Sequence, residues 1–199
     1  MPVVWVISAA RFRDTKTGKF IPQTRVLEYV HESTNASALL LKDLGSQVAQ
    51  GTLTKAAFIT AFREEVKDEV IRQYIAGRGG VGSMTPSDWG RVGSIVKEQY
   101  KYARGFEAVL SDLSEAALTN RASLYAQAAG AAFEYGHKAA IIDSGKFKEE
   151  FWELGDAEHC SDCVELNARG WVPIGSLGTV PRAGSTACLV NCQCQLKYR

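Results

Sequence analysis

The sequence predicts a mainly α-helical protein, either a helical bundle or an elongated helical body, with a β-hairpin at one end and a small cysteine-rich β/loop module at the other. Three observations support this fold class. Apolar residues recur at helical spacing over residues 24–143, two aromatic residues flank a polar turn before that stretch, and all five cysteines follow it. We expect three parts: residues 1–22, 23–145 and 146–199.

The composition is that of an ordinary soluble globular protein. The 199 residues are 46% hydrophobic and 23% charged, with a formal net charge of +1, and a chain of this length can bury a substantial core. The charge does not indicate nucleic-acid or anionic-membrane binding. The apolar opening at residues 3–10 is too short to span a bilayer and lacks the features of a secretory signal. We therefore expect synthesis in the cytoplasm, where clustered cysteines usually bind metal.

Residues 1–22 are predicted to form a β-ribbon. Phe12 and Phe20 flank a polar turn at residues 14–18, as the arms of a hairpin flank its loop. Such an arm can pair with a neighbouring subunit or fold back onto its own domain, and we favour folding back.

The first two of four predicted helices follow this ribbon. The first should run from about Arg25 to Gln50, and the second should begin after Thr52 or Thr54 and end in a glycine-rich stretch at residues 76–83. The second helix carries an apolar stripe at four-residue spacing that a partner helix must cover. Its members are Phe58, Phe62, Val66, Val70 and Tyr74.

Capping residues predict where the third and fourth helices begin. Thr85 can cap the third helix, with Pro86 at the first helical position and Asp88 completing a capping-box-like pair. Ser114 can cap the fourth helix, which should reach about Ile142. Four long helices with short connections are typical of a bundle. The apolar face predicted for the third helix consists of Trp89, Val92, Val96, Ala103, Phe106 and Leu110.

The chain changes character after residue 145. The segment KFKEEFWEL, residues 146–154, alternates as a strand does, with Phe147, Phe151 and Trp152 as apolar anchors. Glycine, proline and cysteine are frequent beyond it, with little periodicity. We expect residues 146–199 to form a module too small to fold on a robust core of its own.

The cysteines of this module match the general plan of a structural zinc site. Cys160 and Cys163 form a C-x2-C pair, the spacing at which one tight turn directs two thiolates at one ion. Cys188, Cys192 and Cys194 follow as C-x3-C-x-C. A bound zinc would supply much of the folding free energy of the module.

Five cysteines and His159 offer six donors for four positions. Cys160 and Cys163 are the strongest candidates, Cys188 is next, and the choice between Cys192 and Cys194 stays open. His159 can equally be a surface residue beside the C-x2-C turn. The alternatives to zinc are disulfide pairs and unrelated reduced thiols.

The sequence shows no catalytic constellation, so we expect no enzymatic activity. Zinc deaminases place H-x-E before P-C-x-x-C, and neither His31 nor His137 is followed by that glutamate; both are interpreted as helix-surface or core-edge residues. The glycine-rich stretch lacks the ending of a phosphate-binding loop and has no strand before it. Residues 146–199 contain six basic and seven acidic residues, a balance that does not favour nucleic-acid binding.

Several segments together carry a resemblance to a known family. They are RFRDTKTGKF, GSMTPSDWGRVGSIVKEQYKY, NRASLYAQAAG and the closing pattern W…HCSDC…GW…C…NCQCQL. With these segments the chain resembles the minor head or head-morphogenesis proteins of tailed bacteriophages. Its C-terminal module is similar to that of the Mu F type, from which it departs at Asn191 and Gln193, so no anion-binding role is carried over to this loop.

The resemblance implies a structural function in a phage virion. The chain would be a minor component of the head or connector region, made in the host cytoplasm, present in multiple copies and bound to the portal or other head proteins. No specific nucleic acid and no membrane are expected as partners. One alternative is a virion-carried enzyme or effector delivered with the DNA, for example a nuclease; another is a zinc adaptor that binds a host factor.

Overall fold

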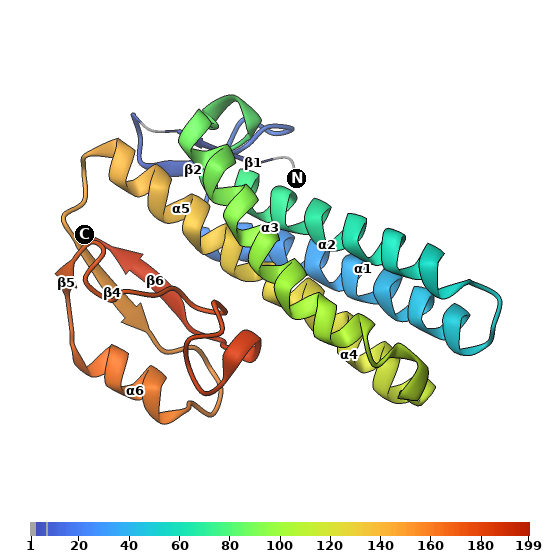
Figure 1. Ribbon diagram of the computed structural model, residues 1–199. Helices are drawn as coiled ribbons and strands as arrows, with labels where there is room; N and C mark the ends of the chain where they lie inside the picture. The colour runs from blue at the N-terminus through green and yellow to red at the C-terminus, as the bar shows by residue number, and fades with distance from the viewer. Residues whose placement is uncertain (1–2, 7) are drawn as a thin grey trace.

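A computed structural model describes residues 3–6 and 8–199, and it confirms the predicted mainly helical fold class (Figure 1). The helices are α1 (Gln23–Ala49), α2 (Lys55–Arg78), α3 (Pro86–Glu107), α4 (Glu115–Ala128), α5 (Gly130–Ser144) and α6 (Ser161–Ala168). The strands are β1 (Val3–Val6), β2 (Arg11–Asp14), β3 (Phe20–Ile21), β4 (Glu149–Glu153), β5 (Val172–Pro173) and β6 (Gln195–Tyr198). Short 3-10 helices occupy Val81–Ser83, Leu110–Asp112 and Leu189–Asn191.

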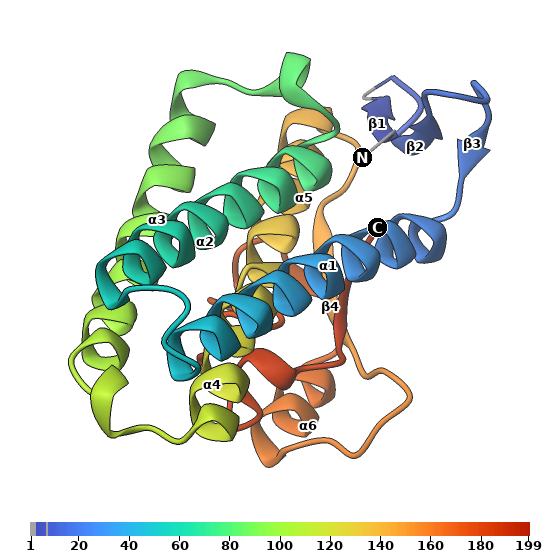
Figure 2. The same cartoon turned by 90° about the vertical axis from the view of Figure 1, so that its right-hand side faces the viewer.

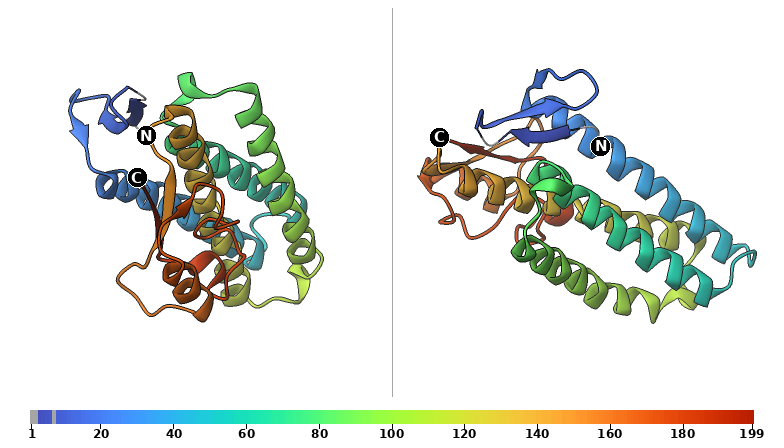
Figure 3. Two further views of the ribbon diagram at one scale, coloured as in Figure 1. Left: turned by 90° about the vertical axis from the view of Figure 1, so that its left-hand side faces the viewer. Right: turned by 90° about the horizontal axis from the view of Figure 1, so that it is seen from above.

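The long helices run up and down, so the chain leaves the bundle at the end where it entered. Helix α1 runs away from the N-terminal sheet, α2 returns, α3 runs away again, and α4 with α5 returns (Figures 1 and 2). Both sheets therefore lie toward the same end of the bundle (Figure 3), not at opposite ends as predicted. Four antiparallel spans, α1, α2, α3 and the combined α4 and α5, return the chain to the end where it started, so the four predicted helices with short connections already imply this arrangement.

The core of the body is the apolar stripe of α2, which is buried along its whole length. Helix α2 packs chiefly against α5, and α1 packs chiefly against α4. Phe62 lies in an aromatic cluster with Phe58, Phe106 and Tyr125, with ring centroids 5.6, 5.4 and 5.0 Å away, respectively. The predicted stripe is thus confirmed as the face that the partner helices cover.

Small residues allow α2 and α5 to approach closely. A Cβ atom on Gly77 would overlap the backbone oxygen of Phe133, and a Cβ atom on Gly136 would overlap the backbone oxygen of Tyr74. The two helices therefore meet backbone to backbone at this crossing, and only glycine fits at either position.

The predicted caps Thr85 and Ser114 are present, and of the two alternatives for the start of α2 the structure has Thr54 as the cap. Thr54 accepts a hydrogen bond from the backbone of Ala57 at 3.2 Å, and Ser114 accepts one from Ala117 at 3.3 Å. Thr85 and Asp88 form a complete capping box at the start of α3, with Pro86 at its first position. These hydrogen bonds satisfy backbone donors that have no partner within a helix.

Two expectations for the helices are wrong. The fourth predicted helix is divided at Ala129, whose backbone donates to Ala126 at 3.2 Å instead of to the residue four positions back. The side chain of Arg182 from the C-terminal module fills the space beside Gly130, just after this break. On α3, Trp89 is 45% exposed although Val92 and Phe106 are buried, because the buried face passes to one side of Trp89.

The N-terminal segment is a three-stranded antiparallel sheet in the order β1-β2-β3, in which Trp5 pairs with Phe12. The backbone N–H of Trp5 donates to the Gly79 carbonyl at 3.2 Å, and Trp5 and Phe12 are buried against the helices. The ribbon therefore folds back onto its own chain, and residues 1–2 and 7 of the predicted segment lie outside the described residues.

The C-terminal module consists of a sheet in the order β5-β4-β6 with α6 beside it. Trp152, predicted as an anchor, is fully buried. Arg182 pairs with Glu134 of α5 at 2.8 Å, and Glu150 pairs with Lys138 of α5 at 2.7 Å; both carboxylates are fully buried. The module is thus packed on the helical body through charged contacts as well as apolar ones.

Candidate metal centre

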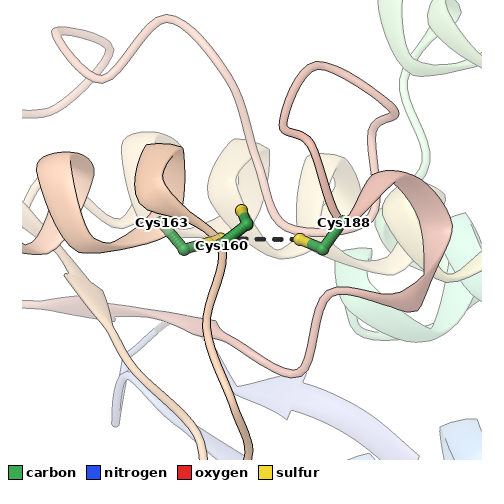
Figure 4. A group of neighbouring side chains, drawn as sticks. All are labelled: Cys160, Cys163 and Cys188. Atoms are coloured by element: carbon green, nitrogen blue, oxygen red, sulfur yellow. Dashed lines mark hydrogen bonds between the residues drawn. The ribbon is translucent and has the colours of Figure 1, made fainter.

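The cysteines reach one site from two segments. Cys160 immediately precedes α6, and Cys163 lies in its first turn. Cys188 and Cys192 flank the 3-10 helix Leu189–Asn191, and Cys194 stands just before β6. Figure 4 shows Cys160 and Cys163 at the start of α6 with Cys188 facing them from the opposite segment.

The thiol separations fit metal coordination and not disulfides. The sulfur of Cys163 lies 3.6 Å from that of Cys188 and 3.7 Å from that of Cys192. A disulfide bond is about 2.0 Å long, and all five cysteines are free. Zinc–sulfur bonds of about 2.3 Å in a tetrahedron place neighbouring sulfurs about 3.8 Å apart. The cluster can therefore hold a metal ion.

Two groups of thiols have their sulfur atoms within 4.8 Å of one another: Cys160, Cys163 and Cys188, and Cys163, Cys192 and Cys194. The second group is buried, whereas Cys160 and Cys188 are partly exposed. All five predicted ligands thus lie together, and Cys163 belongs to both groups.

His159 lies beside this cluster. One ring nitrogen, Nε2, lies 2.9 Å from the carbonyl oxygen of Gly155, and the other, Nδ1, lies 3.8 Å from the sulfur of Cys194. When Nε2 carries the proton and donates it to the carbonyl, Nδ1 keeps the lone pair that a metal needs.

The surroundings of the thiols shift their pKa values in different directions. Hydrogen bonding from the backbone N–H of Cys163, aided by that of Cys188, lowers the pKa of Cys160 to about 7. Burial raises the pKa of Cys163. A shared hydrogen bond between the thiols of Cys192 and Cys194 raises the pKa of Cys192 and lowers that of Cys194. A bound cation would deprotonate all of these thiols.

Polar side chains that the sequence did not single out hold the two segments in place. Asp162 accepts a hydrogen bond from the backbone of Ala187 at 2.7 Å, which joins the start of α6 to the segment that carries Cys188. Asn167 donates to the backbone oxygen of Trp152 at 2.8 Å, which joins α6 to β4. The C-x2-C motif gave no signal for these contacts, because each partner is distant in the sequence.

The other two histidines differ. His31 is exposed on α1, as expected, but His137 is only 3% exposed and lies inside the core. Trp5, Phe12 and Tyr198 surround its ring. Its ring nitrogens have no hydrogen-bond partner among the described residues, and burial lowers the pKa of His137 to about 3.

Comparison of the chain with protein-family models, with curated proteins and with solved structures found no match. Across residues 3–6 and 8–199, no helix combines the length and the apolar character needed to cross a bilayer. The candidate function therefore depends on the geometry of the chain itself and on the motifs of its sequence.

Proposed function

We propose that this is a structural protein whose C-terminal module is closed by zinc. The observation that carries the proposal is the cluster of free thiols around Cys163, with sulfur separations of 3.6 and 3.7 Å. Zinc is the ion that thiolates in tetrahedral structural sites bind most often. It would join α6 to the segment before β6, and it would add binding free energy to a module with a small core.

We further propose that the protein works in the virion of a tailed phage, as a minor component of the head or connector region. The resemblance of its motifs to minor head proteins supports this role, as does a net charge of +1, which does not suit DNA as the main partner. Its partners would be the portal or other head proteins, which it would contact in multiple copies. A stable contact of this kind buries about 1,200–2,000 Å².

Elemental analysis tests the zinc proposal. The full chain, purified without a chelator, should carry zinc in stoichiometric amount, and removing the zinc should lower the midpoint of thermal unfolding. Ser161→Ala is the control variant, because Ser161 is exposed between the ligands but carries no thiol. Zinc-free protein, or native disulfides found by mass spectrometry, would rule the proposal out.

Incorporation into particles tests the virion proposal. Deleting residues 1–22 or 146–199 would expose buried residues of the helical body that pack against them, such as Phe133 and Ala131, so surface substitutions are the better probes. Phe20→Asp on the N-terminal sheet and Val164→Asp on α6 change side chains that are 44% and 50% exposed. At least one should reduce the copy number in purified particles. If neither does, the contact lies on the helices; if the unmodified chain is absent from particles, the virion role is wrong and a nuclease assay becomes the next measurement.

A further inference from the structure

The donors of the metal centre form two overlapping groups, not one tetrahedral set. Each group of mutually close sulfur atoms among the described residues contains three thiols, and the groups share only Cys163. A tetrahedral zinc needs four donors. One ion bound at either group would therefore lack a fourth thiolate, and it would leave two thiols of the other group without metal.

A single ion would use these thiols incompletely, whichever group it bound. Cys163, Cys192 and Cys194 are 1%, 2% and 1% exposed. If the ion bound the group of Cys160 and Cys188, two buried thiols would remain unused in the core. If it bound the buried group, the C-x2-C turn would contribute only Cys163 to coordination, although Cys160 lies beside Cys163 and Cys188 (Figure 4).

We propose that the module holds two zinc ions bridged by the thiolate of Cys163, an inference that rests on the proposed zinc-binding function. Cys160, Cys163 and Cys188 bind the first ion. Cys163, Cys192 and Cys194 bind the second ion, with Nδ1 of His159 as its fourth donor.

His159 reaches this group from the side of Cys194 only. Its Nδ1 is not among the donors that lie within 4.8 Å of one another, so it must move toward Cys163 and Cys192 to complete the tetrahedron. With zinc–nitrogen bonds of about 2.0–2.1 Å and zinc–sulfur bonds of about 2.3 Å, the nitrogen and sulfur of one tetrahedron are about 3.6 Å apart. Nδ1 of His159 lies 3.8 Å from the sulfur of Cys194. The contact of Nε2 with the Gly155 carbonyl orients the ring as the second coordination sphere of metal-bound histidines usually does.

The bridged arrangement also reduces the buried charge. Four thiolates around one zinc carry a net charge of −2, whereas five thiolates around two zinc ions carry −1 and leave no thiol without metal. A smaller net charge lowers the desolvation cost of placing the centre in the protein interior. Because Cys160 and Cys188 are partly exposed, the first ion has an open fourth position, which water or a donor from a partner protein can occupy. The second ion has all four coordination positions filled by the protein.

Titration of the metal-free full chain with Co²⁺ tests this proposal, with ions per chain counted by native mass spectrometry. We expect two ions per chain. The electron paramagnetic resonance signal should rise to one equivalent of Co²⁺ or less and fall as the second ion binds, because a bridging thiolate couples the two spins. Cys160→Ser and Cys194→Ser should each weaken the binding of one ion only, whereas Cys163→Ser should weaken the binding of both. Ser161→Ala should behave as the unmodified chain.

The possible outcomes separate the two proposals. No bound metal contradicts both of them. One ion per chain at saturation supports zinc closure but overturns the bridged centre. Two ions with an undiminished resonance signal mean two separate sites, and they also overturn the bridge. The measurement on the unmodified chain decides between these outcomes even if a variant fails to fold.

Discussion

The guanidinium Nε of Arg78 donates to Oδ2 of Asp88 at 2.9 Å, and both side chains are almost fully buried. Asp88 also accepts hydrogen bonds from Tyr74 and from the backbone of Thr85, at 2.9 and 2.8 Å. One carboxylate thus joins the end of α2 to the start of α3. A buried charge that loses its partner destabilises a protein more strongly than an exposed one, because it cannot recover its hydration.

We therefore expect Asp88→Ala to lower the free energy of unfolding by ~3–5 kcal/mol, through the loss of both the ion pair and the capping box. Denaturant unfolding of the full chain measures this change. The matched control is Asp68→Ala, since Asp68 is exposed and, within residues 3–6 and 8–199, pairs only with Lys67; its effect should stay within ~0.5 kcal/mol. Similar losses of stability for the two variants would contradict the stabilising role of the buried Asp88 carboxylate.

Glycine-to-alanine substitutions test the close approach of α2 and α5. Gly136→Ala would place a Cβ atom against the backbone of Tyr74, so the helices must separate, and we expect a loss of ~1–3 kcal/mol or more. Gly90 lies inside α3 with open space around it. Gly90→Ala should therefore stabilise the chain by ~0.5–1 kcal/mol, because alanine has the higher helix propensity. A rise in the thermal midpoint for both variants would show that the crossing is not close-packed.

The aromatic cluster of the body predicts a large truncation effect. Phe62 is fully buried, and Phe62→Ala should lower the free energy of unfolding by ~3–5 kcal/mol. Phe20→Ala removes the same ring from a side chain that is 44% exposed and serves as the control. A loss below ~1 kcal/mol at Phe62 would mean that this face is not enclosed in the free protein.

Buried His137 predicts a dependence of stability on pH. The pKa of His137 is about 3 in the folded chain and about 6.5 when the chain is unfolded. Between these values the unfolded chain binds a proton that the folded chain excludes, so the free energy of unfolding falls as the pH falls from 6.5 toward 3, by up to ~1.4 kcal/mol per pH unit.

His137→Phe removes this contribution while keeping a ring among Trp5, Phe12 and Tyr198. Relative to the unmodified chain, the variant should become more stable at pH 5 than at pH 7. Urea unfolding of both proteins at several pH values, with the metal site saturated, gives the difference; the titration of the thiols is common to both and cancels. A difference that does not change with pH would show that His137 does not remain neutral in the folded chain.

Local signals in the sequence predicted much of the fold. The Thr85, Pro86 and Asp88 pattern placed the start of α3, because a capping box is built from neighbouring residues. Four-residue spacing identified the buried stripe of α2 for the same reason. In the metal centre, the C-x2-C pair predicted a clustering of thiols that the structure confirms.

Features that depend on distant residues were not predictable in this way. Alanine and glycine at positions 129–130 fit either a continuous or a divided helix, and Arg182, which packs beside Gly130, comes from another part of the chain. The burial of His137 depends on Trp5 and Tyr198, from opposite ends of the sequence. The division of the thiols into two groups depends on how two segments distant in the sequence meet, which cysteine spacing does not determine.

The packing of α2 against α3 and α4 has a consequence for synthesis on the ribosome. Phe58, Phe62 and Val66 form one buried cluster with residues of α1, α3 and α4, and they leave the ribosome well before Ala128, the last residue of α4. At about 5–20 residues per second, translation of the intervening residues 79–128 takes roughly 3–10 s. During that interval the nascent chain exposes these apolar side chains to the cytosol, where holdase chaperones can bind them. Stalling ribosomes just before residue 110 should therefore increase chaperone association, and completing synthesis of the chain should abolish it.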